Sequence, residues 1–93
     1  MATRRLLVLV SLTDGPKHGY AIQQDIESFA RVRLGPGTLY GAIGSLERDG
    51  LIRALRGEDR RRPYEVTPAG RQALQDELDT MTAVLRRAGA AFT

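Results

Sequence analysis

A glycine-rich stretch, GPGTLYGAIGSLERDG at residues 35–50, is the segment of this chain that most resembles a chemical motif. Glycine-rich loops hold phosphates in many nucleotide-binding enzymes. A P-loop, however, needs a lysine and a hydroxyl residue directly after its last glycine, and the only lysine here is Lys17. The dinucleotide pattern G-x-G-x-x-G also fails, because Gly35-x-Gly37-x-x-x-Gly41 has the wrong spacing and follows a polar segment. Neither phosphate-binding loop fits.

Other residues with catalytic or metal-binding chemistry are scarce. The chain contains no cysteine, which excludes disulfides, thiolate zinc sites and cysteine nucleophiles. Its one histidine, His18, has no partner ligands and no supporting nucleophile, so a helix start or a packing position is the better interpretation. We therefore expect no enzymatic activity, no metal site and no cofactor.

Charge is distributed unevenly along the 93 residues, which form one small domain by length. The net charge is +3, and residues 53–62 hold five arginines, whereas residues 72–79 hold three carboxylates and no base. This pattern favours a surface that faces a polyanion such as nucleic acid, with a solvated arginine-rich loop as the alternative. No apolar run approaches the length of a membrane span, and the run at residues 6–10 is too short for a signal peptide, so we expect a cytoplasmic protein.

Three helices precede any strand in the hydrophobic pattern. Residues 3–13 are dense in leucine and valine and stop at Asp14-Gly15-Pro16, which favours a helix buried on most sides. Residues 18–30 carry an apolar stripe of helical period. Residues 36–49 carry another, with Pro36 suited to a first turn and Gly50 to the left-handed position just past the end.

A hairpin and a long helix follow. Residues 51–56 and 63–67 alternate weakly around turn residues, which predicts two strands with an arginine-rich tip. Thr67 then serves as N-cap and Pro68 as the first residue of a C-terminal helix. The apolar residues of that helix recur at intervals of 4, 3, 4, 3 and 4, as in a coiled-coil seam: Leu74, Leu78, Met81, Leu85, Ala88 and Phe92. The seam favours dimerisation with a second copy over packing on its own domain, because so long a helix has little else to bury it.

The glycine-rich stretch makes sense as the third helix of this series. With Leu39, Ile43 and Leu46 facing inward, helical geometry places Thr38 and Tyr40 on the flanks. The residues that point outward are then Gly37, Gly41, Gly44, Ser45 and Arg48. Each glycine inside a helix costs about 1 kcal/mol relative to alanine. Such a face is therefore best explained by the close approach of another molecule.

Two helices, a turn and a third helix with an exposed polar face make a helix-turn-helix, and the arginine-tipped hairpin after it makes a wing. The fold class predicted is α+β, mainly α: a winged helix-turn-helix of three helices and a two-stranded wing (residues 1–67), followed by a long C-terminal dimerisation helix (residues 68–93). In this arrangement the third helix enters the DNA major groove, and wing arginines reach phosphates or the minor groove. The wing candidates are Arg60, Arg61 and Arg62, and Lys17 is a further phosphate candidate.

Four ordered blocks also resemble the PadR family of bacterial transcriptional regulators. They are His18-Gly19-Tyr20, Pro36-Gly37-Thr38-Leu39-Tyr40, Leu46-Glu47-Arg48-Asp49-Gly50-Leu51-Ile52 and Arg62-Pro63-Tyr64-x-x-Thr67-x-x-Gly70. The sequence departs from the family pattern at Gly35, where a serine cap is usual, and at Gly41, where proline is common. The resemblance implies a homodimeric repressor with a C-terminal dimerisation helix, often released by a small aromatic or apolar inducer.

The resemblance also implies roles for individual side chains. Thr38 and Tyr40 are expected at the DNA backbone or groove edge, and Tyr20 at a phosphate. The alternatives are a helix cap for Thr38 and core positions with a surface hydroxyl for the two tyrosines. For Arg48 the alternative to a base or phosphate contact is a favourable interaction with the helix dipole. A rival function is a dimeric adaptor whose basic wing binds an acidic protein, but an adaptor would expose an apolar patch on the third helix.

Overall fold

The computed structural model describes residues 1, 3–56 and 61–92. Its elements follow the predicted order of helices and strands, with one short 3-10 helix, η1, added after the first helix. They are α1 (Thr3–Ser11), η1 (Leu12–Asp14), α2 (Gly19–Ala30), α3 (Pro36–Arg48), β1 (Ile52–Ala54), β2 (Tyr64–Val66) and α4 (Pro68–Ala90). The predicted fold class, a mainly helical winged helix-turn-helix with a long C-terminal helix, is confirmed.

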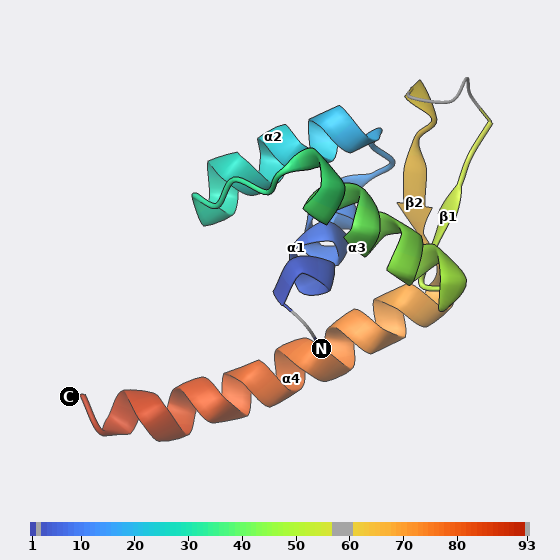
Figure 1. The fold of residues 1–93 in the computed structure, drawn as a ribbon. Coiled ribbons are helices and arrows are strands. Elements are labelled where there is room, and N and C mark those ends of the chain that lie inside the picture. Colours follow the sequence, from blue (N-terminus) through green and yellow to red (C-terminus); the bar gives the residue numbers. More distant parts are fainter. Residues whose placement is uncertain (2, 57–60, 93) are drawn as a thin grey trace.

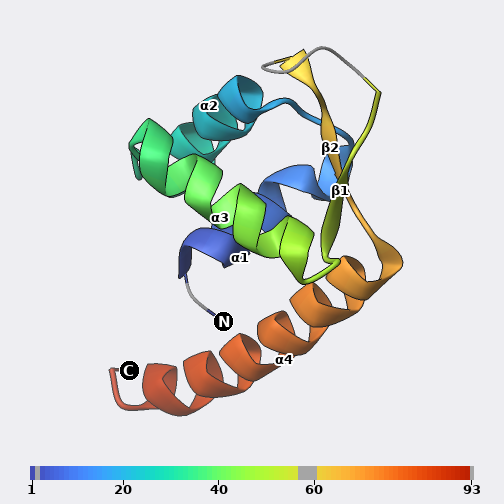
Figure 2. The same cartoon turned by 45° about the vertical axis from the view of Figure 1, so that its right-hand side comes forward.

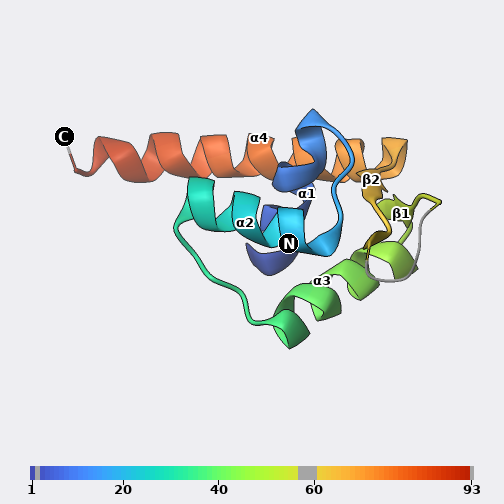
Figure 3. The same cartoon turned by 90° about the horizontal axis from the view of Figure 1, so that it is seen from above.

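The molecule is elongated, with principal extents of 50 × 26 × 21 Å, because α4 runs past the body formed by the other elements (Figure 1). Helix α1 packs against α2, α3 and α4 and so lies at the centre of the helical layer. The view from above shows α4 along one side, with its C-terminal end projecting beyond the rest of the fold (Figure 3). None of the described helices combines the length and the hydrophobicity that crossing a membrane requires.

The core is aliphatic, as expected for a chain with few aromatic residues. Apolar residues at helical spacing on α1, α2 and α3 face one another, which explains why these segments form helices and how they stay together. The buried members are Val8, Leu9, Leu12, Ile22, Ile26, Leu39, Ala42, Ile43, Leu46, Ile52, Val66 and Leu74. The inward face predicted for the third helix is thereby confirmed.

The hairpin is antiparallel, with Ile52 opposite Val66 and Ala54 opposite Tyr64 (Figure 2). Its strands are shorter than the sequence predicted, three residues each. The segment before α2 adds to them: Lys17 N donates to Tyr64 O at 3.1 Å, and Tyr64 N donates to Lys17 O at 2.9 Å. This bridge fixes the wing relative to the helix-turn-helix.

The start of α4 is fastened to the base of the hairpin. Thr67 caps the helix by accepting from Gly70 N at 3.1 Å, and its hydroxyl donates to Gly50 O at 2.6 Å. Gly50 has φ 72°, the left-handed conformation predicted from its place after the third helix. A Cβ on Gly70 would lie only 2.8 Å from Val66 Cγ2 and 2.9 Å from Leu51 C, so the close packing here requires glycine.

The burial of Leu74 within its own chain corrects the predicted dimerisation seam. The side chain is 5% exposed and belongs to the core cluster of its own chain. The first two turns of α4 are therefore part of the winged-helix body, and the exposed apolar face of this helix begins at Leu78.

Candidate nucleic-acid interface

The outward face of α3 carries almost no side chains. Gly37 and Gly41 are exposed, and an added Cβ at either position would meet no atom within 4 Å. Gly44 is half-buried, and the Arg48 guanidinium folds back over it, with Nη1 3.7 Å from the position that a Cβ would take. The result is a flat strip of helix backbone beside one exposed arginine, which another molecule could approach closely.

Helix α1 holds one edge of this face. The Arg5 Nη1 donates to Ser45 Oγ at 2.7 Å and to Asp49 Oδ2 at 2.6 Å. Because Ser45 and Asp49 lie four residues apart, one guanidinium joins two successive turns at the C-terminal half of α3. Ser45, predicted to point outward, is half-buried beneath this arginine rather than fully exposed.

Two tyrosines flank the other end of the face. Tyr20 on α2 is 66% exposed and Tyr40 on α3 is 45% exposed. The Tyr40 ring packs on the backbone of Gly19, where an added Cβ would lie 2.8 Å from its Cζ. Both tyrosines line a small, mainly apolar pocket of about 140 Å³. Thr38 is half-buried and does not line this pocket; it lies in a separate groove together with Arg4 and Arg5.

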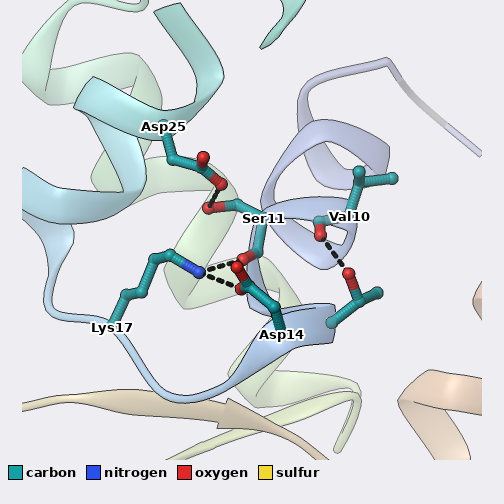
Figure 4. A network of polar contacts seen from close by, with 6 residues as sticks. Val10, Ser11, Asp14, Lys17 and Asp25 are labelled. Atoms are coloured by element: carbon teal, nitrogen blue, oxygen red, sulfur yellow. Dashed lines mark hydrogen bonds and ion pairs between the residues drawn. The ribbon is translucent and has the colours of Figure 1, made fainter. Parts of the chain in front are cut away.

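His18 and Lys17 are used within the fold. The His18 side chain caps α2 by accepting from Ala21 N at 3.4 Å, and its ring stacks near Tyr20 at a centroid distance of 6.5 Å. Lys17 donates to Ser11 O at 2.5 Å and forms an ion pair with Asp14 (Figure 4). The predicted phosphate candidate Lys17 is therefore already paired with a carboxylate.

The same network ties α1 to α2 and shifts one pKa. Ser11, which is buried, donates to Asp25 Oδ2 at 2.8 Å (Figure 4). The hydrogen bond and the charge of Lys17 together hold the pKa of Asp14 below its ordinary value of 3.8. On the wing, burial and then the nearby Glu47 carboxylate raise the pKa of Tyr64, so this phenol stays protonated at neutral pH.

The wing presents basic residues beyond its short strands. Arg61 is exposed and Arg62 is half-buried, whereas Arg60 lies outside the described residues. Arg53 on β1 pairs across the ladder with Glu65 on β2, with Nε 2.5 Å from Oε2. Arg53 is thus neutralised locally, and no ion pair is recorded for Arg61 or Arg62 within the described part of the chain.

Sequence reasoning missed two basic residues beside α3. Arg4 and Arg5, in the first turn of α1, line a groove of about 290 Å³ together with residues of the glycine face: Gly37, Thr38, Gly41, Ala42 and Ser45. In the sequence these two arginines directly precede the short apolar run at residues 6–10, and the pattern gives them no binding role. Their place beside α3 depends on tertiary packing that no local pattern reveals.

The exposed half of α4 carries a second, apolar surface. Leu78, Met81, Val84, Leu85 and Phe92 are all exposed, up to 71% for Leu85 and 88% for Phe92. This exposed apolar face runs along one side of α4 between Glu77 and Ala88, and no other element of the described chain lines it. Among the described residues, no group of His, Cys, Asp or Glu could hold a metal ion.

The comparison with protein families agrees with this arrangement. Residues 8–76, which span the helix-turn-helix, the wing and the start of α4, match the transcriptional regulator PadR-like family. The chain belongs to the PadR-like family. This is a family of transcriptional regulators, and the predicted family resemblance is confirmed.

Two proteins of known sequence are similar to this PadR-like chain over most of its length. It is 48% identical over 83 residues to a 37.1 kDa protein in transposon Tn4556 of Streptomyces fradiae, covering 89% of this chain but only 24% of that protein. It is 36% identical over 89 residues to the transcriptional regulator Rv3488 of Mycobacterium tuberculosis, covering 91% and 81% of the two chains. The chain thus spans about a quarter of the first relative and most of the second.

The fold of this PadR-like regulator also matches a transcriptional regulator from Clostridium thermocellum. The two structures share a TM-score of 0.82 at 26% identity, over 92% of this chain and 89% of the other. The match extends well beyond the family-matched segment and therefore includes much of α4.

Proposed function

We propose that this PadR-like regulator binds operator DNA as a homodimer and represses transcription by covering a promoter in the cytoplasm. The observation that carries the proposal is the exposed backbone strip of α3 at Gly37 and Gly41, next to Tyr40 and Arg48. A helix that lies in the major groove reads base edges from such a face, while the wing arginines contact phosphates. The acidic-protein adaptor is disfavoured, because α3 exposes no large aliphatic side chain among its outward residues.

The exposed face of α4 supports the dimer. Its seam is self-complementary when two copies of α4 run antiparallel about a two-fold axis that crosses the seam between Met81 and Leu85. Met81 then faces Leu85 of the other copy, and Leu78 faces Ala88. Burial of these exposed apolar side chains, at about 25 cal/mol per Å², is the driving force.

The proposed dimer also bears on the form of the operator and on the place of an inducer. Two copies of α3 related by a two-fold axis would lie about one DNA turn apart, roughly 34 Å, and so favour a pseudo-palindromic operator. A small aromatic or apolar inducer would bind between the two paired α4 helices, where Leu78, Met81 and Leu85 offer an apolar lining. Binding there would change how the two α4 helices pair and thereby the distance between the two α3 helices that contact DNA.

Fluorescence anisotropy tests the DNA proposal. The probe is the DNA immediately upstream of the coding region, compared with a scrambled duplex at about 50 and 200 mM salt. A specific site should bind at least about 10³-fold tighter than the scrambled duplex, with strong weakening by salt. Alanine at Arg60, Arg61 and Arg62 together should weaken binding to both duplexes and flatten the salt dependence. No binding even at low salt would favour the adaptor.

Sedimentation equilibrium tests the dimer. Leu85→Glu places a charge in the seam and should give a monomer at concentrations where the natural chain is a dimer. Ala83→Glu is the matched control, because it adds the same charge to an exposed position on the opposite side of the same helix. Equal effects of both substitutions would rule out the seam as the interface.

A further inference from the structure

The groove between the first turn of α1 and the outward face of α3 combines the features of an anion site. Arg4 and Arg5 form one wall, the backbone of Gly37 and Gly41 forms the floor, and Thr38 and Ser45 contribute hydroxyls. We propose that this groove, of about 290 Å³, holds a phosphate of the DNA backbone, with Arg4 as the contacting residue and Arg5 as a positioning residue. The inference rests on the proposed DNA-binding function and adds α1 to its contact surface.

The two arginines differ in what already binds them. Arg5 is committed to Ser45 and Asp49, and the Asp49 carboxylate 2.6 Å away neutralises much of its charge. Arg4 is exposed, and no hydrogen bond or ion pair is recorded for its side chain within the described part of the chain. The Arg4 guanidinium therefore has hydrogen-bond donors available for a phosphate. Arg5 instead links α1 to α3 and so maintains the width of the groove.

The floor of the groove indicates that its ligand is a phosphate within a DNA strand and not a free phosphate ion. A Cβ at Gly37 or Gly41 would meet nothing within 4 Å, so the groove continues directly onto the exposed strip of α3. A DNA strand that follows this strip would pass between the arginine wall and the helix. Guanidinium groups bind phosphate through charge-assisted hydrogen bonds, and such contacts fix the register of a reading helix without reading sequence.

The test compares Arg4→Gln with Arg86→Gln in the full chain. Both substitutions remove one positive charge at an exposed position. Arg86, however, lies near the C-terminal end of α4, and that end of the helix projects away from α3 (Figure 1). Because the proposed dimer carries two copies of Arg4, loss of one phosphate contact per protomer should reduce the steepness of log K against log salt by about 1.8. Binding near 0.1 M salt should weaken about 60-fold, equally on operator and scrambled duplexes. Arg86→Gln should leave slope and affinity close to those of the natural chain, with the dimer checked by sedimentation.

A second measurement locates the contact. Neutral methylphosphonates are placed one at a time along the operator, and binding is measured for the natural chain and for Arg4→Gln. Two symmetry-related positions, one in each half-site, should each weaken binding of the natural chain about eightfold and should have no further effect on Arg4→Gln. An unchanged salt slope for Arg4→Gln, an equal loss with Arg86→Gln, or the absence of any coupled phosphate would overturn the inference while leaving DNA binding intact. Failure of the natural chain to bind any duplex would instead overturn both proposals.

Discussion

The Tyr40 ring rests on the backbone of Gly19, so that the first residue of α2 determines where a tyrosine of α3 lies. An added Cβ on Gly19 would sit 2.8 Å from Tyr40 Cζ and 3.0 Å from Cε1, closer than side chains normally pack. The atoms that would clash belong to the far end of one side chain and not to backbone. The tyrosine can therefore move, and the helix need not.

Gly19→Ala should consequently displace Tyr40 with little effect on folding. We expect the free energy of unfolding to change by less than about 1 kcal/mol, since alanine is the better helix former and offsets part of the crowding. DNA affinity should fall several-fold if the placement of Tyr40 matters for binding. Thermal denaturation and anisotropy measure the two effects separately.

The matched control for this effect is a double-mutant cycle with Tyr40→Ala. Once the ring is gone, Gly19→Ala should be neutral or stabilising and should have no further effect on DNA affinity. If the two substitutions add independently in DNA binding, the contact between Gly19 and Tyr40 does not position the tyrosine for DNA.

A second glycine, Gly70, should be far less tolerant of substitution. Its neighbours include the backbone of Leu51, which cannot move without disturbing the base of the wing, and Thr67, which caps the same turn. We expect Gly70→Ala to destabilise the fold by about 1–3 kcal/mol or more, as overpacking of a close contact does. Urea denaturation followed by circular dichroism gives the difference.

Gly89 is the control within the same helix. A Cβ there would meet nothing within 4 Å, so Gly89→Ala should stabilise the chain or leave it unchanged, by up to about 1 kcal/mol. Equal destabilisation by both substitutions would show that the close packing of α4 on Leu51 does not limit stability.

The ion pair of Lys17 with Asp14 makes a prediction about pH. Because Lys17 holds the folded-state pKa of Asp14 below 3.8, the pair contributes stability above about pH 3.8 and loses it as pH falls through the folded-state pKa. Lys17→Gln should raise the pKa of Asp14 towards 3.8, which a side-chain NMR titration measures directly. Asp14→Asn is the companion variant, because it keeps the bond from Lys17 to Ser11 but abolishes the titration. A pKa unchanged in Lys17→Gln would mean that the pair does not form in solution.

Local patterns were sufficient to predict most of the fold. The apolar stripes of α1, α2 and α3 specify helices because burial on one side needs that spacing, and Gly50 and Thr67 mark helix ends through their own backbone and capping chemistry. Leu74 could not be assigned in this way. A 4-3 spacing states which residues share one face of a helix, but not whether the chain itself or a second copy covers that face.

The candidate site was predictable only in part, for the same reason. Periodicity gave the outward face of α3, with Gly37, Gly41 and Arg48 exposed as expected. The partners of Arg5 on α3 lie about 40 residues away in sequence, at a separation of 40 for Ser45 and 44 for Asp49, and only the packing of α1 brings them together. The ion pair of Lys17, a predicted phosphate candidate, with Asp14 was likewise not indicated by the hydrophobic pattern.

Substitution of Gly41 should affect the stability of the protein and its affinity for DNA in opposite directions. It lies exposed in the middle of α3, where an added Cβ meets nothing, so Gly41→Ala should stabilise the isolated protein by up to about 1 kcal/mol. In a domain of this size that gain would raise Tm by about 4–8 °C. If DNA approaches the backbone of α3 as proposed, the same methyl group should weaken operator binding, and the larger Gly41→Gln should weaken it more. Gly89→Ala, also free of contacts but far along α4, should leave binding unchanged. A Gly41→Gln protein that is stable and binds the operator with undiminished affinity would show that the glycine strip does not face DNA.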